Sequence, residues 1–293
     1  MRDFELLQPT TVAEASTMLA DGGEDCRAMA GGTALMLVMR QRMVSPSHLI
    51  WLNGIEALRG IRFDPALGLR IGALSLHSEI ARSPLVQAHC PMLASMAARV
   101  ANPQVRNQGT LGGNLCYGDP STDPPSCLMA LGAQVVLASV RGERVLSMEE
   151  FLVDYFVTAL APDELVLEVR VPPAPDHQQG LYTRFKRTAA EHRPLASVAL
   201  VVQRQGLQCL QASLVVGASV PVPRRLARAE QLLCSQPMSL ELAAEAAALV
   251  AADIEPISDL RGSDSYRREM VRVNAQRSIE ALFGLSPQER MQP

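Results

Sequence analysis

The sequence contains no long apolar run, no excess of basic residues and few aromatic side chains. Its most alanine-rich stretch, residues 240–252, is interrupted by Glu241 and Glu245, whereas a transmembrane helix needs roughly 18 uncharged apolar residues. The 293 residues include 27 Lys and Arg against 30 Asp and Glu, and only 4% are aromatic. Because nucleic-acid binding depends on basic surfaces and stacking aromatics, we expect a soluble protein with no transmembrane segment that binds no nucleic acid.

Export and metal-binding signals are also missing. The first ten residues, MRDFELLQPT, carry acidic residues where a signal peptide needs an apolar core, so a cytoplasmic location is expected. The six cysteines form no C-x-x-C pair and no cluster along the chain. This spacing predicts neither a zinc site nor an iron–sulfur site, and we expect reduced thiols that are mostly buried.

The common catalytic and nucleotide-binding motifs are absent as well. The sequence has no G-x-G-x-x-G after its first expected strand and no G-x-x-x-x-G-K-[ST], which argues against Rossmann and P-loop sites. It has neither G-x-S-x-G nor H-E-x-x-H. Its histidines occur singly, which is more typical of structural than of catalytic residues: His48, His77, His89, His177 and His192.

The first part of the chain alternates between expected strands and helices. Thr11 and Glu14 have capping-box spacing and predict a helix that ends at Gly22–Gly23. Downstream, hydrophobic patterns and prolines predict strands, a hairpin and a broken helical stretch. The expected strands are 26–30, 48–53, 133–139 and 165–171, the hairpin is 60–63 with 69–72, and the helical segments are 34–42, 76–100 (broken at Pro84 and Pro91), 126–131 and the one starting at Ser147.

A polar, glycine-rich segment over residues 102–123 is too long for an ordinary connector. Loops of this length are either functional or disordered, and this one has too many Leu and Val residues for disorder. We therefore predict a binding loop.

The proline-rich segment 172–180 is the best candidate for a domain boundary. After it, residues 182–187, 196–202 and 207–217 have strand patterns, and residues 225–234, 240–252 and 266–282 have helical ones. In the last helix Val271, Ala275, Ile279 and Leu282 share one face. This order predicts a compact α+β domain at the C-terminus.

Two glycine loops are the most informative local motifs. Residues 30–35 and 109–114 both place paired glycines at an expected helix start, where free backbone N–H groups approach an anion closely. A Gly-Gly pair by itself usually marks only a turn. Two such loops in one domain favour a pyrophosphate held between them.

These residues carry a family resemblance. The run AGGTALMLVMRQRM (30–43) and the run VANPQVRNQGTLGGNLCYGDPSTDPPSCLMALGA (100–133) resemble the two glycine loops of the FAD-binding medium subunit of molybdenum hydroxylases, the xanthine dehydrogenase and carbon monoxide dehydrogenase family. Residues 163–172 resemble a family strand at the flavin, Phe185–Lys186 resembles its Phe-Lys strand start, and residues 266–282 resemble its C-terminal helix. The resemblance runs over nearly the whole chain.

The resemblance implies a fold and its domains. The expected fold is α+β, with an N-terminal two-lobed FAD-binding domain of the PCMH type and a C-terminal antiparallel sheet with a helical bundle. The expected limits are 1–175 for the first domain, with lobes of about 1–56 and 57–175, and 178–285 for the second, of the carbon monoxide dehydrogenase flavoprotein type.

It also implies a set of FAD-binding residues. In the family, backbone amides of both loops bind the pyrophosphate, here those of Ala30 to Leu35 and Thr110 to Asn114. Asp123 matches an aspartate that contacts FAD, and its alternative role is a helix N-cap. Val166 and Lys186 match positions at the isoalloxazine ring. Their alternative roles are a core valine and a solvated lysine at a strand edge. Ala34 replaces the family's usual polar residue, so any side-chain hydrogen bond made there is absent. The full expected set is Ala28, Met29, Ala30, Gly31, Gly32, Thr33, Ala34, Leu35, Val100, Thr110, Leu111, Gly112, Gly113, Asn114, Asp123, Val166 and Lys186.

The expected function follows from the same resemblance. FAD is the only cofactor expected in this chain, because the cysteines offer no grouping for an extra iron cluster. A large partner would carry the molybdenum cofactor and a small partner the two-iron two-sulfur clusters, in a dimer of heterotrimers. FAD in this oxidoreductase subunit would pass electrons from the clusters to an external acceptor, and no catalytic side chain is expected. A stand-alone FAD-dependent oxidase or dehydrogenase and a non-catalytic scaffold subunit are the alternatives, and neither the organic substrate nor the acceptor follows from the sequence.

Overall fold

A computed structural model describes residues 2–285 of the chain and divides it into two compact units. The first unit comprises the residues up to Asp119 together with Gly132–Pro173. The second comprises Pro120–Leu131 and the residues from Ala174 onward. The expected domain of residues 1–175 therefore differs from the first unit in the segment Pro120–Leu131.

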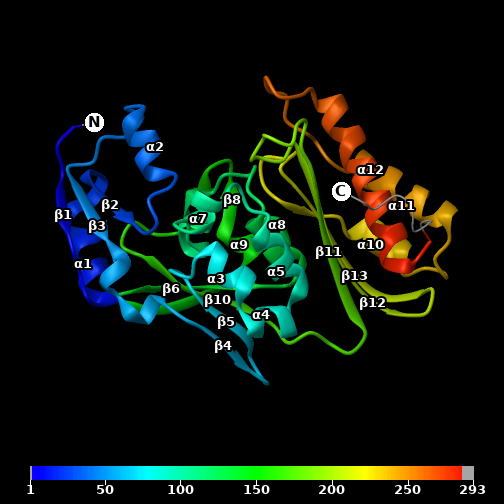
Figure 1. The fold of residues 1–293 in the computed structure, drawn as a ribbon, viewed down its shortest axis with the longest axis horizontal. Coiled ribbons are helices and arrows are strands. Elements are labelled where there is room, and N and C mark those ends of the chain that lie inside the picture. Colours follow the sequence, from blue (N-terminus) through cyan, green and yellow to red (C-terminus); the bar gives the residue numbers. More distant parts are fainter. Residues whose placement is uncertain (1, 286–293) are drawn as a thin grey trace. The chain divides into compact units, whose positions relative to one another are not determined.

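The first lobe of the first unit is a small parallel sheet with helices (Figure 1, blue). Strands β1 (Glu5–Leu7), β3 (His48–Trp51) and β2 (Cys26–Met29) lie in that order, and helices α1 (Val12–Gly22) and α2 (Leu35–Arg40) connect them, with short 3₁₀ turns at Gly23–Asp25, Leu52–Gly54 and Glu56–Leu58. The predicted cap is present, because Thr11 Oγ1 accepts a hydrogen bond from the Glu14 amide at 3.1 Å. The Glu14 carboxylate accepts from the Thr10 amide at 2.8 Å and completes the helix start.

The second lobe is built on a five-stranded antiparallel sheet. Its strand order is β4 (Ile61–Asp64), β5 (Gly68–Gly72), β10 (Leu165–Val171), β6 (Gln134–Ser139) and β7 (Gly142–Ser147). The predicted hairpin of β4 and β5 is present, whereas β7 was not predicted, because four of its six residues are exposed and show no alternation. The lobe also contains α3 (His77–Arg82), α4 (Pro84–His89), α5 (Pro91–Ala98), α9 (Met148–Phe151) and the hairpin of β8 (Leu152–Asp154) and β9 (Val157–Thr158).

The predicted binding loop over residues 102–123 is not a plain loop. It contains α6 (Pro103–Arg106) and α7 (Leu111–Tyr117). Side-chain caps start both helices: Asn102 Oδ1 accepts from the Val105 amide at 2.9 Å, and Thr110 Oγ1 accepts from the Gly113 amide at 3.1 Å. These caps compensate for the low helix propensity of the prolines and glycines around them.

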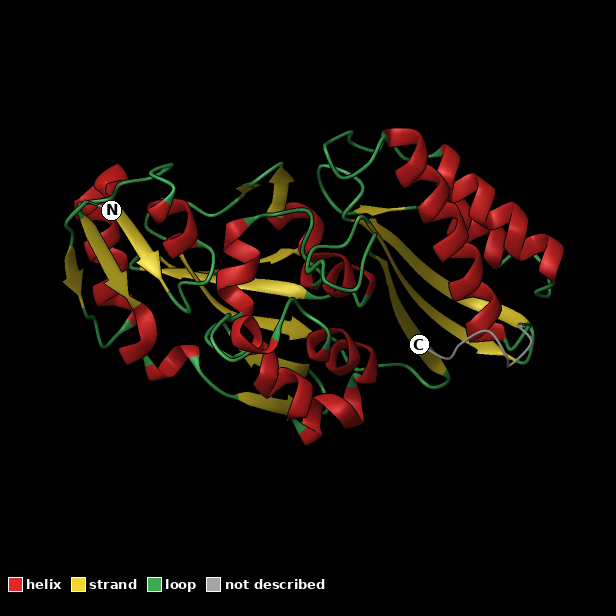
Figure 2. Ribbon diagram, turned by 45° about the horizontal axis from the view of Figure 1, so that its top comes forward, coloured by secondary structure: helices red, strands yellow, loops and turns green. Residues whose placement is uncertain are grey.

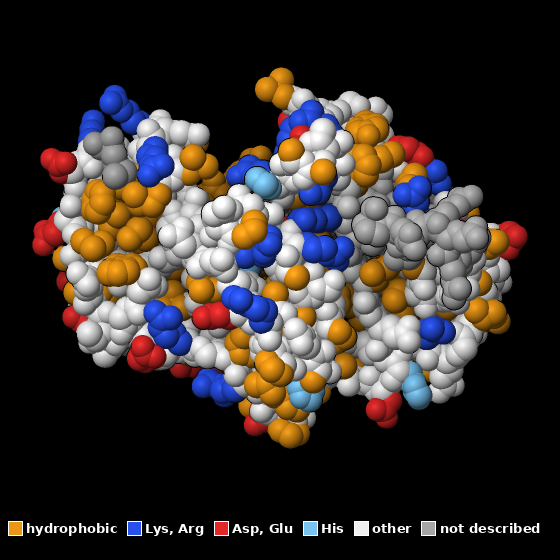
Figure 3. Space-filling view, in the orientation of Figure 1, with side chains coloured by type: hydrophobic (Ala, Val, Ile, Leu, Met, Phe, Trp, Pro, Cys, Tyr) orange, Lys and Arg blue, Asp and Glu red, His pale blue; other side chains and the backbone are white. Residues whose placement is uncertain are grey.

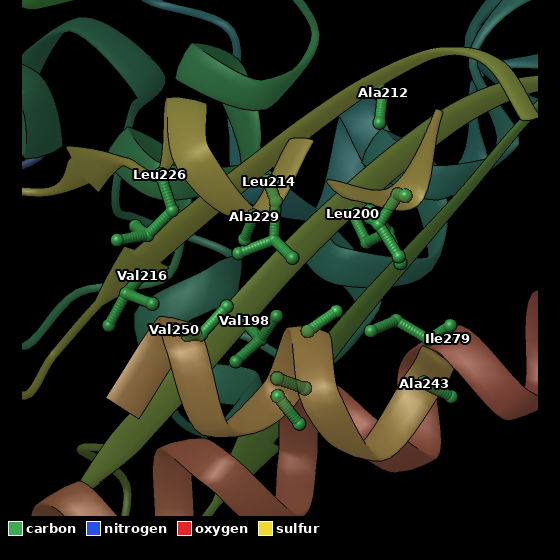
Figure 4. Close-up of a cluster of buried hydrophobic side chains, with 14 of the residues drawn as sticks. Val198, Leu200, Ala212, Leu214, Val216, Leu226, Ala229, Ala243, Val250 and Ile279 are labelled. Carbon is green, nitrogen blue, oxygen red and sulfur yellow. The ribbon is translucent and has the colours of Figure 1, made fainter. Parts of the chain in front are cut away.

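The second unit is a four-stranded antiparallel sheet with three helices on one face (Figure 2). The strands are β11 (Gln178–Phe185), β12 (Ala196–Gln205), β13 (Gln208–Gly217) and β14 (Arg224–Arg225), and the helices are α10 (Ala227–Leu233), α11 (Leu240–Ala252) and α12 (Asp264–Phe283). Alternate residues of β12 and β13, among them Val198, Leu200, Leu214 and Val216, pack against these helices (Figure 4). Strand β11 begins inside the predicted linker of residues 172–180, so that linker is shorter than expected.

Helix α8 (Pro124–Ala130) belongs to the second unit although its sequence precedes the boundary by some fifty positions. It packs on β12 and β13. The approach is close, because a Cβ placed on Gly217 would lie 2.8 Å from the Cβ of Ser126. The glycine at this position is therefore explained by helix–sheet packing.

No helix among residues 2–285 is long and apolar enough to cross a bilayer. On the face drawn in Figure 3, hydrophobic side chains occur in separate patches between polar and charged ones.

Candidate functional site

The two glycine loops, residues 30–35 and 109–114, lie against each other in the first unit. A Cβ placed on Gly31 would be 1.8 Å from the carbonyl oxygen of Gln108, and one placed on Gly109 would be 3.5 Å from Thr33 Oγ1. A Cβ on Gly113 would lie 3.7 Å from that of Ala30. The fold thus brings together two motifs that the sequence separates by about eighty positions.

The first glycine loop presents backbone donors that the protein itself leaves unused. Helix α2 begins at Leu35 with Ala34 as its N-cap, and no side chain caps it. Within residues 2–285, the amides from Gly31 to Leu35 donate no hydrogen bond, while Gly32 has a φ of +69°. Successive free amides around a left-handed glycine form the kind of concave site that binds an anion.

The second glycine loop is different, because its amides have acceptors within the chain. The amides of Leu111 and Gly112 donate to the carbonyls of Ser75 (3.0 Å) and Ala73 (2.9 Å). Those of Gly113 and Asn114 donate to Thr110, at 3.1 Å to Oγ1 and 3.0 Å to its carbonyl. Four of the amides expected to grip a pyrophosphate are therefore occupied within the chain. Their helix is capped by its own threonine, and its start is bonded to the turn before α3.

Gly112 lies close to the protein's own backbone. A Cβ there would lie 2.6 Å from the Cβ of Ala73, so the missing side chain makes room for the protein's own backbone.

Two buried polar atoms beside the loops have no partner within residues 2–285, namely His77 Nδ1 and Asn114 Oδ1. The backbone N–H of His77 donates to the Gly109 carbonyl at 3.1 Å. Burial, assisted by the charge of Arg106, lowers the pKa of His77 to about 4, so its ring is neutral. Buried polar atoms without partners are costly, and a polar ligand beside the loops would satisfy them. In the sequence, His77 is one of several isolated histidines, and nothing there marks it as a site residue.

The other expected residues of the first unit surround this region or lie in the core. Ala28 and Met29 are half-buried in β2, where they pair with Ile50 and Trp51. The carbonyl of the buried Val100 accepts from Arg106 at 2.8 Å. Val166 is buried in β10 next to a break in the strand register, which fits its alternative role as a core residue.

Asp123 belongs to the second unit and is 3% exposed. It occupies the N-cap position of α8, but its side chain makes no capping hydrogen bond. Instead, Oδ1 accepts from the Tyr182 hydroxyl at 2.8 Å and Oδ2 accepts from Arg184 Nη1 at 2.9 Å. Burial and the nearby carboxylate raise the pKa of Tyr182 well above its usual value, so the phenol stays a donor.

Lys186 also belongs to the second unit and directly follows β11. Phe185 is the last residue of that strand, so the Phe-Lys pair ends a strand and does not start one. The lysine is half-buried, and its Nζ donates to the Ala189 carbonyl at 3.2 Å. Within residues 2–285, no group of three or more His, Cys, Asp or Glu side chains is arranged to hold a metal ion.

Comparisons with known proteins match both parts of the chain. Residues 2–174 match the family model described as the FAD binding domain in molybdopterin dehydrogenase, and residues 181–282 match the CO dehydrogenase flavoprotein C-terminal domain. The chain is 32% identical to the carbon monoxide dehydrogenase medium chain of Hydrogenophaga pseudoflava, over 96% of this chain and 97% of that one. It is 33% identical to the nicotine 6-hydroxylase medium subunit of Paenarthrobacter nicotinovorans, over 92% and 94% of the two chains. A solved structure of the Hydrogenophaga pseudoflava carbon monoxide dehydrogenase superposes with a TM-score of 0.93 at 32% identity, covering 98% of this chain and 99% of that one.

Proposed function

Because this chain belongs to the family of FAD-binding medium subunits of molybdenum hydroxylases, we propose that it passes electrons from iron–sulfur clusters of a small partner subunit to an external acceptor. The substrate would be oxidised on a large partner that carries the molybdenum cofactor. The assembly is a dimer of heterotrimers in the cytoplasm. The isoalloxazine ring of FAD, when bound, supplies the redox chemistry, and the chain supplies position and electrostatics.

The unused amides of the first glycine loop are the observation that carries this proposal. Five successive N–H groups, from Gly31 to Leu35, have no acceptor within residues 2–285, and no side chain caps the helix that follows them. They suit the diphosphate of FAD, which needs donors close to the backbone.

The second glycine loop packs against the first one. The carbonyl of Gln108, the residue before this loop, lies against Gly31, and Thr110 caps helix α7. We assign the unpartnered atoms His77 Nδ1 and Asn114 Oδ1 to direct contacts with the cofactor. Thr110 to Asn114 thus act through position and side chains more than through their amides.

The remaining assigned residues rest on the family resemblance. Ala28 and Met29 directly precede the first glycine loop, Val100 lies just before α6, and β10, which holds Val166, packs against α7. Lys186 brings a positive charge and Asp123 a carboxylate held by two donors. None of these groups moves a proton, as expected of a subunit whose task is to receive and release electrons.

Reconstitution of the purified chain with FAD tests the cofactor assignment. We expect bound flavin absorbance at one FAD per chain after removal of free FAD. A chain that stays colourless would refute the proposal.

Partner chains test the direction of electron flow. After co-purification with its partners, addition of the organic substrate should bleach the flavin, and removal of the iron–sulfur subunit should abolish the bleaching. Turnover of an organic donor by the isolated chain would instead make it a stand-alone flavin enzyme.

A further inference from the structure

Two cysteines that lie 25 positions apart in the sequence meet in the second unit. Cys209 lies near the start of β13, and Cys234 follows the last residue of α10. Their sulfur atoms are 3.7 Å apart. A disulfide requires about 2.05 Å, so small side-chain rotations would bring the two sulfurs into bonding distance.

Hydrogen bonds hold both cysteines in place. The Gln208 side chain donates to the carbonyls of Cys209 (3.2 Å) and Cys234 (3.5 Å). The Cys234 thiol points to the Cys209 sulfur, and the Cys209 thiol donates to the Gln211 carbonyl at 3.4 Å. The backbone just after Cys234 is fixed as well, because the Met238 amide donates to the Leu207 carbonyl at 2.8 Å. The two sulfur atoms are therefore already held close to each other in the reduced protein.

The two thiols differ in access. Cys209 is 1% exposed and lies in the hydrophobic core of this unit. Burial, together with the neighbouring Cys234, raises the pKa of Cys209 to about 12, which keeps it a protonated thiol. Cys234 is only partly buried at the edge of the same core, so a small oxidant in solution reaches Cys234 first.

We propose that Cys209 and Cys234 form an oxidisable dithiol, which a hydroperoxide converts into a disulfide that links β13 to the end of α10. In the first step the Cys234 sulfur attacks one peroxide oxygen, the O–O bond breaks, and a sulfenic acid and water form when hydrogen peroxide is the oxidant. In the second step the Cys209 sulfur displaces the hydroxyl from Cys234, the S–S bond forms, and the Cys209 proton leaves with that hydroxyl as a second water. The two sulfurs lose two electrons, and the peroxide gains them.

Peptide mapping of the full chain tests this proposal. The reduced protein is treated with hydrogen peroxide, remaining thiols are blocked, and the protein is digested without reductant. We expect a linked peptide pair containing Cys209 and Cys234 that lacks two hydrogens, and its disappearance after treatment with a thiol reductant. Recovery of Cys234 as a sulfinic acid or as an unmodified thiol, with Cys209 unlinked, would overturn the proposal.

Variants separate this pair from the other cysteines. Cys234→Ser, at the partly exposed position, should reduce the linked peptide to background, and Cys209→Ala should do the same if the serine variant folds poorly. Cys90→Ser, at a buried position in the first unit, should leave the yield unchanged. A disulfide that joins Cys234 to another cysteine or to a second chain would contradict the assignment.

Discussion

The hydroxyl of Tyr182 donates a 2.8 Å hydrogen bond to Oδ1 of Asp123, which lies 59 positions earlier in the sequence. Arg184 donates to the other carboxylate oxygen from the same strand, β11. The segment that leads into α8 is thereby tied to the sheet of the second unit. A buried carboxylate with two donors is well paired, and loss of one donor leaves it partly unsatisfied.

The first prediction concerns this pair. Tyr182→Phe should lower the free energy of unfolding by about 1–3 kcal/mol, because a buried acceptor loses its partner. Denaturant unfolding of the purified chain measures this. Tyr155→Phe is the matched control, since Tyr155 is 48% exposed, so its effect should be close to zero. Equal effects of the two variants would show that the hydrogen bond contributes little.

The second prediction concerns the contact between the glycine loops. Gly31→Ala should weaken FAD binding at least about tenfold, a change of about 1.4 kcal/mol, because its Cβ would collide with the Gln108 carbonyl. Flavin titration measures this. Gly284→Ala is the control: Gly284 has a φ of +69° and open space around it, so alanine should cost stability but leave flavin binding unchanged. Normal flavin affinity of Gly31→Ala would contradict the role of this contact.

The third prediction uses an unusual feature of the composition, since Lys186 is the only lysine in the chain. An amine-reactive reagent can therefore modify only Lys186 and the N-terminal amine. If Lys186 approaches the flavin, bound FAD should slow its modification several-fold, while the N-terminal amine reacts at an unchanged rate. Peptide mass spectrometry measures both rates in one sample. Equal modification with and without FAD would place Lys186 outside the flavin site.

The fourth prediction concerns acid stability. The hydrogen bonds from Arg144, at 2.7 Å to each oxygen, lower the pKa of Glu164 from its ordinary value of 4.5. Its contribution to stability is therefore fully present above pH 4.5 and is lost as the pH falls through the lowered pKa. Glu164→Gln should flatten the decline of stability below pH 4.5, as measured by unfolding at a series of pH values. Glu143→Gln, at an exposed position, should leave the decline unchanged.

Local signals in the sequence predicted much of the fold. The pairs Thr11–Glu14 and Ser147–Glu150 have capping-box spacing, and both start helices, because a cap involves only neighbouring residues. The hairpin at residues 205–206 follows from two apolar runs with one turn between them. Strand β7 was not predicted, because its sequence has no apolar pattern of its own. It is a strand because it pairs with β6.

The candidate site was only partly predictable. The sequence marked both glycine loops and so indicated backbone donors for an anion. It did not distinguish the free amides of residues 31–35 from the occupied amides of residues 111–114, because the acceptors at Ala73 and Ser75 lie in another segment. Nor did it indicate that His77 Nδ1 has no hydrogen-bond partner within residues 2–285, or that the sulfurs of Cys209 and Cys234 lie close together.

The amino-acid sequence by itself determined most of the helices, the β4–β5 and β12–β13 hairpins and the two glycine loops, because these depend on residues a few positions apart. It also determined the family, through motifs that extend over nearly the whole chain. Tertiary structure alone decided which donors stay free, which glycines serve packing, that α8 joins the second unit, and which thiols meet. Those properties depend on contacts between distant segments, and such contacts exist only after the chain has folded.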